Sequence, residues 1–187
     1  MADTTAPASR IAGAPEEFQL AFEQAPIGIA LVAPDGRFLW VNQALARICG
    51  YGPVELLGLT FQDITHPDDL DADLAQVEAM IAGSITAYSM EKRYLHARGH
   101  EVPVQLDVSM VRAGDGGPRY FISHVQDITE RRATIEALAS AHDALRASQQ
   151  RFAALVERST DIICIIDEQG CIAYHSPAAE RLLGHAP

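Results

Sequence analysis

The sequence repeats its own beginning near its end, at a constant offset of 134 residues and without a gap. Residues 18–51 lie opposite residues 152–185, and glycines recur in register, with Gly36 opposite Gly170. A repeat of this length predicts one structural module, a connector and the opening part of a second module. The expected boundaries are a tail at 1–15, a first domain at 16–132, a connector at 130–156 and a truncated second domain at 152–187.

The charge balance argues against one broad class of partner. The chain has 14 Lys and Arg residues against 25 Asp and Glu residues, which gives a formal net charge of −11. Its one dense basic cluster, Arg131-Arg132, directly follows Glu130, so the chain lacks the basic stripe that nucleic acids or anionic membranes require. We therefore expect no nucleic acid and no direct membrane contact.

The cysteines and the apolar segments indicate a cytoplasmic protein. Cys49, Cys164 and Cys171 are odd in number and include no pair at metal-ligand spacing, so we expect reduced thiols and no metal site. No apolar run reaches the ~18–20 residues of a membrane span. Residues 1–15 are rich in Ala, Thr and Pro without an apolar segment, which predicts a disordered tail rather than a signal peptide.

Periodicity predicts a mixed fold between residues 16 and 132. Apolar spacings of three and four indicate helices, alternation indicates strands, and Pro34-Asp35-Gly36 has the chemistry of a hairpin turn. Two strands, a helical insert and three further strands predict an α+β domain whose antiparallel sheet carries helices on one face. The expected strands are 27–32, 38–41, 86–97, 102–112 and 120–126, and the main helices are 16–24, 43–49 and 67–82.

Five short segments occur in a distinctive order and spacing. They are Pro34-Asp35-Gly36-Arg37, the segment 50–58, Thr65-His66-Pro67-Asp68-Asp69, the turn 98–104 and Asp127-Ile128-Thr129-Glu130-Arg131. Together they resemble the PAS family of sensor modules. The resemblance implies a five-stranded antiparallel sheet in the spatial order 2-1-5-4-3, a long connector helix and a partial second PAS module. It also implies a concave sheet face that, with the helices, can enclose a small ligand.

Apolar side chains on the predicted strands and helices form a candidate ligand pocket. The alternative, which we favour, is that they only fill the core, because regularly spaced apolar residues usually pack against one another. The candidates are Ile29, Leu31, Phe61, Leu74, Val77, Leu106, Val108, Met110, Phe121 and Val125.

The sequence argues against two cofactors that members of this family bind. Flavin photoreceptors of this fold carry a reactive cysteine in the segment that corresponds to residues 58–62, which contains none, so a covalent flavin adduct is not expected. Haem-binding members supply a histidine from within the long helix, and residues 70–82 contain none. His66, at the start of that helix, is expected to shape its cap. A non-covalent flavin or a small metabolite stays open, so the cofactor is unknown.

An acidic cluster lies in the first turns of the same helix. It consists of Asp68, Asp69, Asp71 and Asp73. Negative charge stabilises a helix N-terminus, so we expect these side chains to form a solvated face. The cluster lacks the glycine-centred loop of a calcium site.

The connector shows the heptad pattern of a coiled-coil seam, with alternating spacings of three and four. The seam comprises Ile135, Leu138, His142, Leu145, Gln149, Phe152 and Val156. His142 and Gln149 put polar side chains at a-type positions, which weakens a seam while fixing its register. We favour a homodimer formed through this helix and the first domain. The alternative is a single amphipathic helix that packs on its own module.

Asp127, Ile128 and Thr129 lie where the last predicted strand passes into the connector. Thr129 is expected to cap the connector helix, with Glu130 in its first turn. The family resemblance implies that changes in the sheet reach the helix through this junction. These three residues are therefore the candidate signal relay.

The sequence shows no G-x-S-x-G elbow, no phosphate-binding glycine loop and no metal-ligand cluster, so we expect no catalytic residue and no enzymatic activity in this chain. We interpret it as a sensory signal-transduction region of a bacterial regulator, which relays a ligand, redox or partner signal to a downstream effector. One alternative is a pure dimerisation module. Another is the N-terminal part of an enzyme, either a histidine kinase of a two-component system or a diguanylate cyclase or phosphodiesterase of cyclic di-GMP signalling.

Overall fold

The computed structural model describes residues 15–184 and divides them into two compact units, with the boundary after Arg131. The expected disordered tail, 1–15, lies outside the described residues except for Pro15. The Pro15 carbonyl accepts hydrogen bonds from the backbone N–H groups of Phe18 and Gln19. Within the described part of the chain, no helix is long and apolar enough to cross a membrane.

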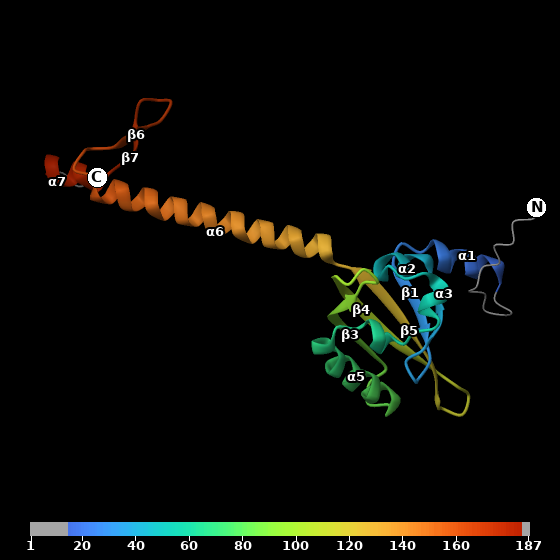
Figure 1. The fold of residues 1–187 in the computed structure, drawn as a ribbon. Coiled ribbons are helices and arrows are strands. Elements are labelled where there is room, and N and C mark those ends of the chain that lie inside the picture. The colour runs from blue at the N-terminus through green and yellow to red at the C-terminus, as the bar shows by residue number, and fades with distance from the viewer. Residues whose placement is uncertain (1–14, 185–187) are drawn as a thin grey trace, which may run out of the picture. The chain divides into compact units, whose positions relative to one another are not determined.

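The first unit is built on five antiparallel strands in the order β2-β1-β5-β4-β3 (Figure 1). This order confirms the α+β architecture expected from the sequence. The strands are β1 (Gly28–Val32), β2 (Phe38–Val41), β3 (Ala87–Leu95), β4 (Glu101–Arg112) and β5 (Pro118–Asp127). The β1–β2 turn closes at Gly36, whose φ of 95° is a conformation that glycine adopts at little cost.

Helices occupy both faces of this sheet. The four helices between β2 and β3 pack on the inner face, where they enclose the core; they are α2 (Gln43–Cys49), α3 (Pro53–Leu56), α4 (Phe61–Ile64) and α5 (Pro67–Ile81). The N-terminal helix α1 (Glu16–Gln24) packs on the outer face, where the ring of Phe22 stacks on Trp40 with 3.7 Å between centroids. This outer helix is an addition to the expected arrangement with helices on one face.

A β-bulge in β2 sends aromatic side chains to opposite faces of the sheet. Trp40 pairs with Leu31 and Phe38 pairs with Val32, which leaves Leu39 as the extra residue. Phe38 therefore joins the inner core, whereas Trp40 lies on the outer face under α1. Without the bulge, the two rings would share one face, because side chains alternate along a regular strand.

Asn42 fastens four segments of the first unit together. Its side chain is fully buried, and its Oδ1 accepts hydrogen bonds from the backbone N–H groups of Ile29 and Leu45. Its Nδ2 donates to the carbonyls of Phe22 and Ile27. The residue that caps α2 thus also satisfies backbone groups of α1, of the following loop and of β1.

The second unit repeats the opening of the first. Its elements are α6 (Thr129–Arg158), β6 (Cys164–Ile166), β7 (Ile172–His175) and α7 (Pro177–Leu183). Ser176 occupies the position of Asn42, and its Oγ accepts a hydrogen bond from the backbone N–H of Ile163, the counterpart of Ile29. The repeat is therefore one of structure as well as sequence.

The end of α6 takes the place of α1 in this repeat. Val156 corresponds to Phe22 and is likewise buried, with 3% of its surface exposed. The expectation that Val156 forms part of a dimer seam is therefore wrong, because its side chain is already buried within the second unit. The other apolar seam residues, from Ile135 to Phe152, are exposed.

We predict that Asn42→Ala lowers the free energy of unfolding of the first unit by about 3 kcal/mol, because it leaves buried donors and acceptors unpaired. Asn42→Ser introduces the residue that the second unit has at this position and keeps a hydroxyl acceptor, so it should cost less. Urea unfolding followed by the fluorescence of Trp40, the sole tryptophan, measures both variants. Equal losses would contradict the role assigned to the side-chain acceptor.

Candidate functional site

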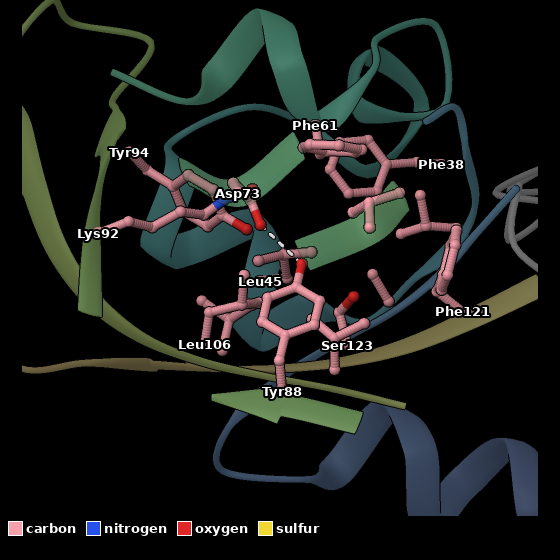
Figure 2. Close-up of a pocket in the computed structure, with 15 residues that line it drawn as sticks. Phe38, Leu45, Phe61, Asp73, Tyr88, Lys92, Tyr94, Leu106, Phe121 and Ser123 are labelled. Atoms are coloured by element: carbon pink, nitrogen blue, oxygen red, sulfur yellow. Dashed lines mark hydrogen bonds and ion pairs between the residues drawn. The ribbon is translucent and has the colours of Figure 1, made fainter. Parts of the chain in front are cut away.

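A pair of opposite charges lies inside the core of the first unit. The Nζ of Lys92 is 2.5 Å from the Oδ2 of Asp73, and each side chain has 1% of its surface exposed. Asp73 comes from α5 and Lys92 from β3, so the pair joins the longest inner helix to the edge of the sheet. Figure 2 shows both side chains pointing into the space between α5 and the sheet.

The pair is completed by two hydroxyl groups. The phenol of Tyr88 donates to Asp73 Oδ1 at 2.6 Å, and Lys92 also donates to Thr65 Oγ1 at 2.9 Å (Figure 2 shows the Tyr88 bond). The ammonium group also lies 4.6 Å from the ring centroid of Tyr94 and 5.3 Å from that of Phe61. Both carboxylate oxygens of Asp73 therefore have a donor, as a buried charge requires.

Burial governs the protonation of these groups. Desolvation lowers the pKa of the Lys92 ammonium, and the Asp73 carboxylate opposes that shift. Desolvation, followed by the charge of Asp73, raises the pKa of Tyr88 above its usual range, so the phenol keeps its proton and acts as a donor. A paired, buried charge seldom stabilises a fold more than apolar residues would, which makes the cluster a candidate for function.

The expectation that the acidic cluster forms a solvated face is wrong for Asp73. The sequence position of Asp73 indicates burial, because it falls on the apolar face of the helix. The residues of that face, at spacings of three and four, are Leu70, Asp73, Val77 and Met80. On β3, Lys92 likewise shares the inward alternation of Tyr88 and Tyr94. A charge inside an apolar pattern was the sign that sequence reasoning missed.

Asp69 of the same cluster makes an ion pair at the rim of the unit. The guanidinium of Arg93 donates to its carboxylate at 2.9 and 3.0 Å, and these hydrogen bonds hold the pKa of Asp69 below its usual value. His66 accepts a hydrogen bond from the backbone N–H of Asp68 through Nδ1, as a residue that caps α5 does. The start of α5 is thereby fixed to β3.

The internal cavity beside the charged pair is small, with a volume of about 20 Å³. A water molecule needs about 10–15 Å³ on this measure, whereas ligand pockets for drug-sized molecules run to about 300–1,000 Å³. The cavity therefore has room for about one water, and a flavin or haem would have to displace core side chains. Its lining is Ala30, Val32, Phe38, Leu45, Phe61, Asp73, Val77, Tyr88, Lys92, Tyr94, Leu106, Val108, Phe121, Ser123 and Val125.

The structure divides the predicted pocket residues into three groups. Those that line the internal cavity are Phe61, Val77, Leu106, Val108, Phe121 and Val125. Leu74 and Met110 pack against the core without lining that cavity. Ile29 and Leu31 lie on the opposite face of the sheet, beneath α1, and their assignment to this pocket is corrected. On β1 the inward side chains are instead Ala30 and Val32.

The predicted relay residues lie at the exit from the sheet. Ile128 is buried, and its backbone N–H donates to the Pro103 carbonyl of β4 at 3.0 Å. Asp127 Oδ1 accepts a hydrogen bond from the backbone N–H of Thr129 at 2.8 Å. Thr129 is the first residue of α6, so the side chain that caps the helix is that of Asp127, which corrects the expected role of Thr129.

Two further sequence expectations concern cysteine and metals. Cys49 is buried, and desolvation raises the pKa of its thiol to about 12, which keeps it protonated and unreactive at neutral pH. Among residues 15–184, no group of three or more His, Cys, Asp or Glu side chains is arranged to hold a metal ion.

Comparison with known proteins gives matches for both units. A family model described as PAS fold matches residues 22–133, and a second PAS-fold model matches residues 150–187. The probable diguanylate cyclase DgcE of Escherichia coli (strain K12) is 50% identical over 117 residues, which cover 63% of this chain and 11% of that protein. The sensor histidine kinase TmoS of Ectopseudomonas mendocina is 26% identical over 117 residues, covering 63% of this chain and 12% of that protein.

A solved structure supports the same fold. The PAS domain of a Colwellia psychrerythraea protein matches with a TM-score of 0.57 and 18% identity, covering 61% of this chain and 96% of that one. At this identity the likeness concerns the fold alone. The matched part of the chain spans only about a tenth of the length of each of the two curated relatives described above.

For the charged pair, we predict that Lys92→Met lowers the free energy of unfolding by about 3–5 kcal/mol, because it leaves the buried Asp73 carboxylate uncompensated. The double variant Asp73→Leu/Lys92→Met should recover most of that loss. Urea unfolding of the two single variants and the double variant measures the coupling. Additive losses would mean that the two charges do not depend on each other.

For the relay, we predict that Asp127→Ala destabilises the first turn of α6 by about 1 kcal/mol, because it removes the hydrogen-bond acceptor that caps the helix. Thr129→Ala is the matched control and should have a smaller effect. Amide hydrogen exchange at residues 129–132 reports the difference. The reverse order of effects would restore Thr129 as the cap.

Proposed function

The chain belongs to the PAS family of sensory signal-transduction modules, and from this we propose that it relays a signal from its first module through α6 to a downstream effector. The observation that carries the proposal is the continuous path from the buried charged pair to an exposed helix. Asp73 and Lys92 join α5 to β3, which pairs with β4, and β4 pairs with β5, the strand that leads into α6.

Ile128 and Asp127 support the relay role of the junction. Ile128 is buried, and its backbone N–H ties it to β4 through the hydrogen bond to the Pro103 carbonyl, so a shift of β4 against β5 would move the start of α6. Asp127 would pass the same shift to the helix through its bond to Thr129. A displacement of the sheet strands would therefore be passed by these contacts to the first residue of α6.

The exposed stripe of α6 supports a homodimer. Between 55% and 71% of the surface of each of Ile135, Leu138, Leu145 and Phe152 is exposed, and they follow one another at heptad spacings broken only by His142 and Gln149. Pairing with the same stripe of a second copy would bury them. Polar a positions keep such a seam weak, so two pairings can lie close in free energy and a signal can shift the balance between them.

We further propose that the chain works in the cytoplasm, as part of a longer protein whose effector is a diguanylate cyclase or a sensor histidine kinase. The two relatives described above support this choice of effector, since one is a probable diguanylate cyclase and the other a sensor histidine kinase. The module itself is non-catalytic. The runner-up function is a PAS pair that only holds a dimer together, with no signal passing from the core to the helix.

For the dimer, we predict that Leu138→Asp/Leu145→Asp converts the chain to a monomer, because it places charges in the apolar seam. His142→Ile should instead tighten the dimer, since a β-branched residue at an a position favours two strands. Ala147→Asp, on the opposite side of the heptad, is the matched control and should change little. Light scattering between about 1 and 100 μM measures all three, and a wild-type monomer throughout that range would contradict the seam.

The relay and the pure dimer differ in one measurable coupling. If the core communicates with α6, the folded double variant Asp73→Leu/Lys92→Met should shift the dimer dissociation constant by at least about fivefold, the lower end of the usual range of allosteric coupling. A pure dimerisation module predicts an unchanged constant. Sedimentation equilibrium of the wild type and the double variant decides between the two functions.

A further inference from the structure

The outer face of the first sheet carries a second hollow that is far larger than the internal cavity. It has a volume of about 370 Å³, against about 20 Å³ for the cavity beside the charged pair. Helix α1 forms its wall and the central strands form its floor. We call it the outer groove, and its lining residues are Phe18, Ala21, Phe22, Ile29, Leu31, Trp40, Ser109, Ile122 and His124.

The strand register arranges the floor in two rows. In the first row, Trp40 lies opposite Leu31, Leu31 opposite Ile122, and Ile122 opposite Ser109. The floor is thus apolar on β2, β1 and β5 and becomes polar on β4. The rings of Phe22 and Trp40, stacked with 11° between their planes, close the apolar end.

The second row ends in a charge. Ile29 lies opposite His124, and His124 lies opposite Asp107. A neighbouring hollow of about 410 Å³ shares Ser109 and His124 with the outer groove and is also lined by Asp107. The two hollows therefore form one trough with an apolar end at β2 and an acidic end at β4.

Size and charge together define the class of occupant. A volume of about 370 Å³ falls within the range of small-molecule sites, about 300–1,000 Å³. Among the described residues that line the trough, Asp107 is the one carboxylate, and none is a lysine or an arginine. A carboxylate beside an apolar surface attracts a positive charge attached to an apolar body, and the net charge of −11 adds to that attraction at long range.

We propose that this trough, formed by the outer groove and the neighbouring hollow, binds a small amphipathic cation, an amine with an aromatic or branched apolar body. The apolar body packs against Leu31, Ile122 and the exposed ring of Phe18, and the ammonium group pairs with the carboxylate of Asp107. His124 provides a ring nitrogen that can accept a further hydrogen bond from the ammonium. A ligand bound there would contact the outer face of β5, the strand that leads into α6.

The test uses the sole tryptophan, Trp40, as its reporter. Phenethylamine is titrated into the full chain while the emission of Trp40 is followed, and phenylacetate, which has a similar body and the opposite charge, is the matched ligand. We expect a saturable change with phenethylamine and binding at least about fivefold weaker with phenylacetate. Asp107→Asn should weaken phenethylamine binding up to about fivefold, as loss of one exposed ion pair does, whereas Asp115→Asn in the β4–β5 turn should not.

Several outcomes would overturn the proposal. One is a wild-type chain that shows no saturable change up to about 10 mM, which corresponds to a binding free energy weaker than about −2.7 kcal/mol. Another is equal binding of both ligands, or no effect of Asp107→Asn, since either would show that charge does not select the occupant. A dimer that dissociates on Ile122→Glu, in a chain that does not bind the amine, would assign the groove to a second copy instead.

Discussion

The bond between Asp73 and Lys92 is the contact on which the inner half of the first module depends. It joins α5 to β3 through two residues that are 19 positions apart in the chain, across a largely apolar core that holds about one water of free space. Because neither charge has access to solvent, each is tolerable only while the other is in place. The position of α5 against β3 is therefore specified by charge, and apolar contacts fill the space around the pair.

The sheet has two structurally different faces, and the bulge at Leu39 places one aromatic ring of β2 on each of them. On the inner face Phe38 closes a core with almost no free volume, which leaves a buried polar cluster as its distinctive feature. On the outer face Trp40 and α1 border a groove with room for a small molecule. Strand β5 contributes side chains to both faces and is the strand that continues into α6, so the proposed relay would connect either side of the sheet with the same helix.

Helix α6 serves two modules at once. Its first residue is capped by Asp127 from the end of β5, and its last nine residues replace α1 in the second unit, where Val156 is buried as Phe22 is in the first. The stripe between these ends stays exposed. Because the end of α6 is itself packed in the second unit, a rotation of the helix would move the residues that pack against Val156.

The sequence by itself determined the modular plan, the antiparallel strands and the short helices, because the internal repeat, turn chemistry and periodicity can be read directly from it. The strand order was implied by the resemblance to the PAS family, which rests on five short segments in order and not on periodicity. The tertiary structure alone decided which face of β1 is inside. Residues 28–32 are apolar on both sides, since helices cover both faces of the sheet, so alternation carried no information about Ile29 and Leu31. The tertiary structure also decided that Asp73 is buried. Burying a carboxylate costs free energy unless an opposite charge lies beside it, and here that charge is Lys92, which is distant in the sequence.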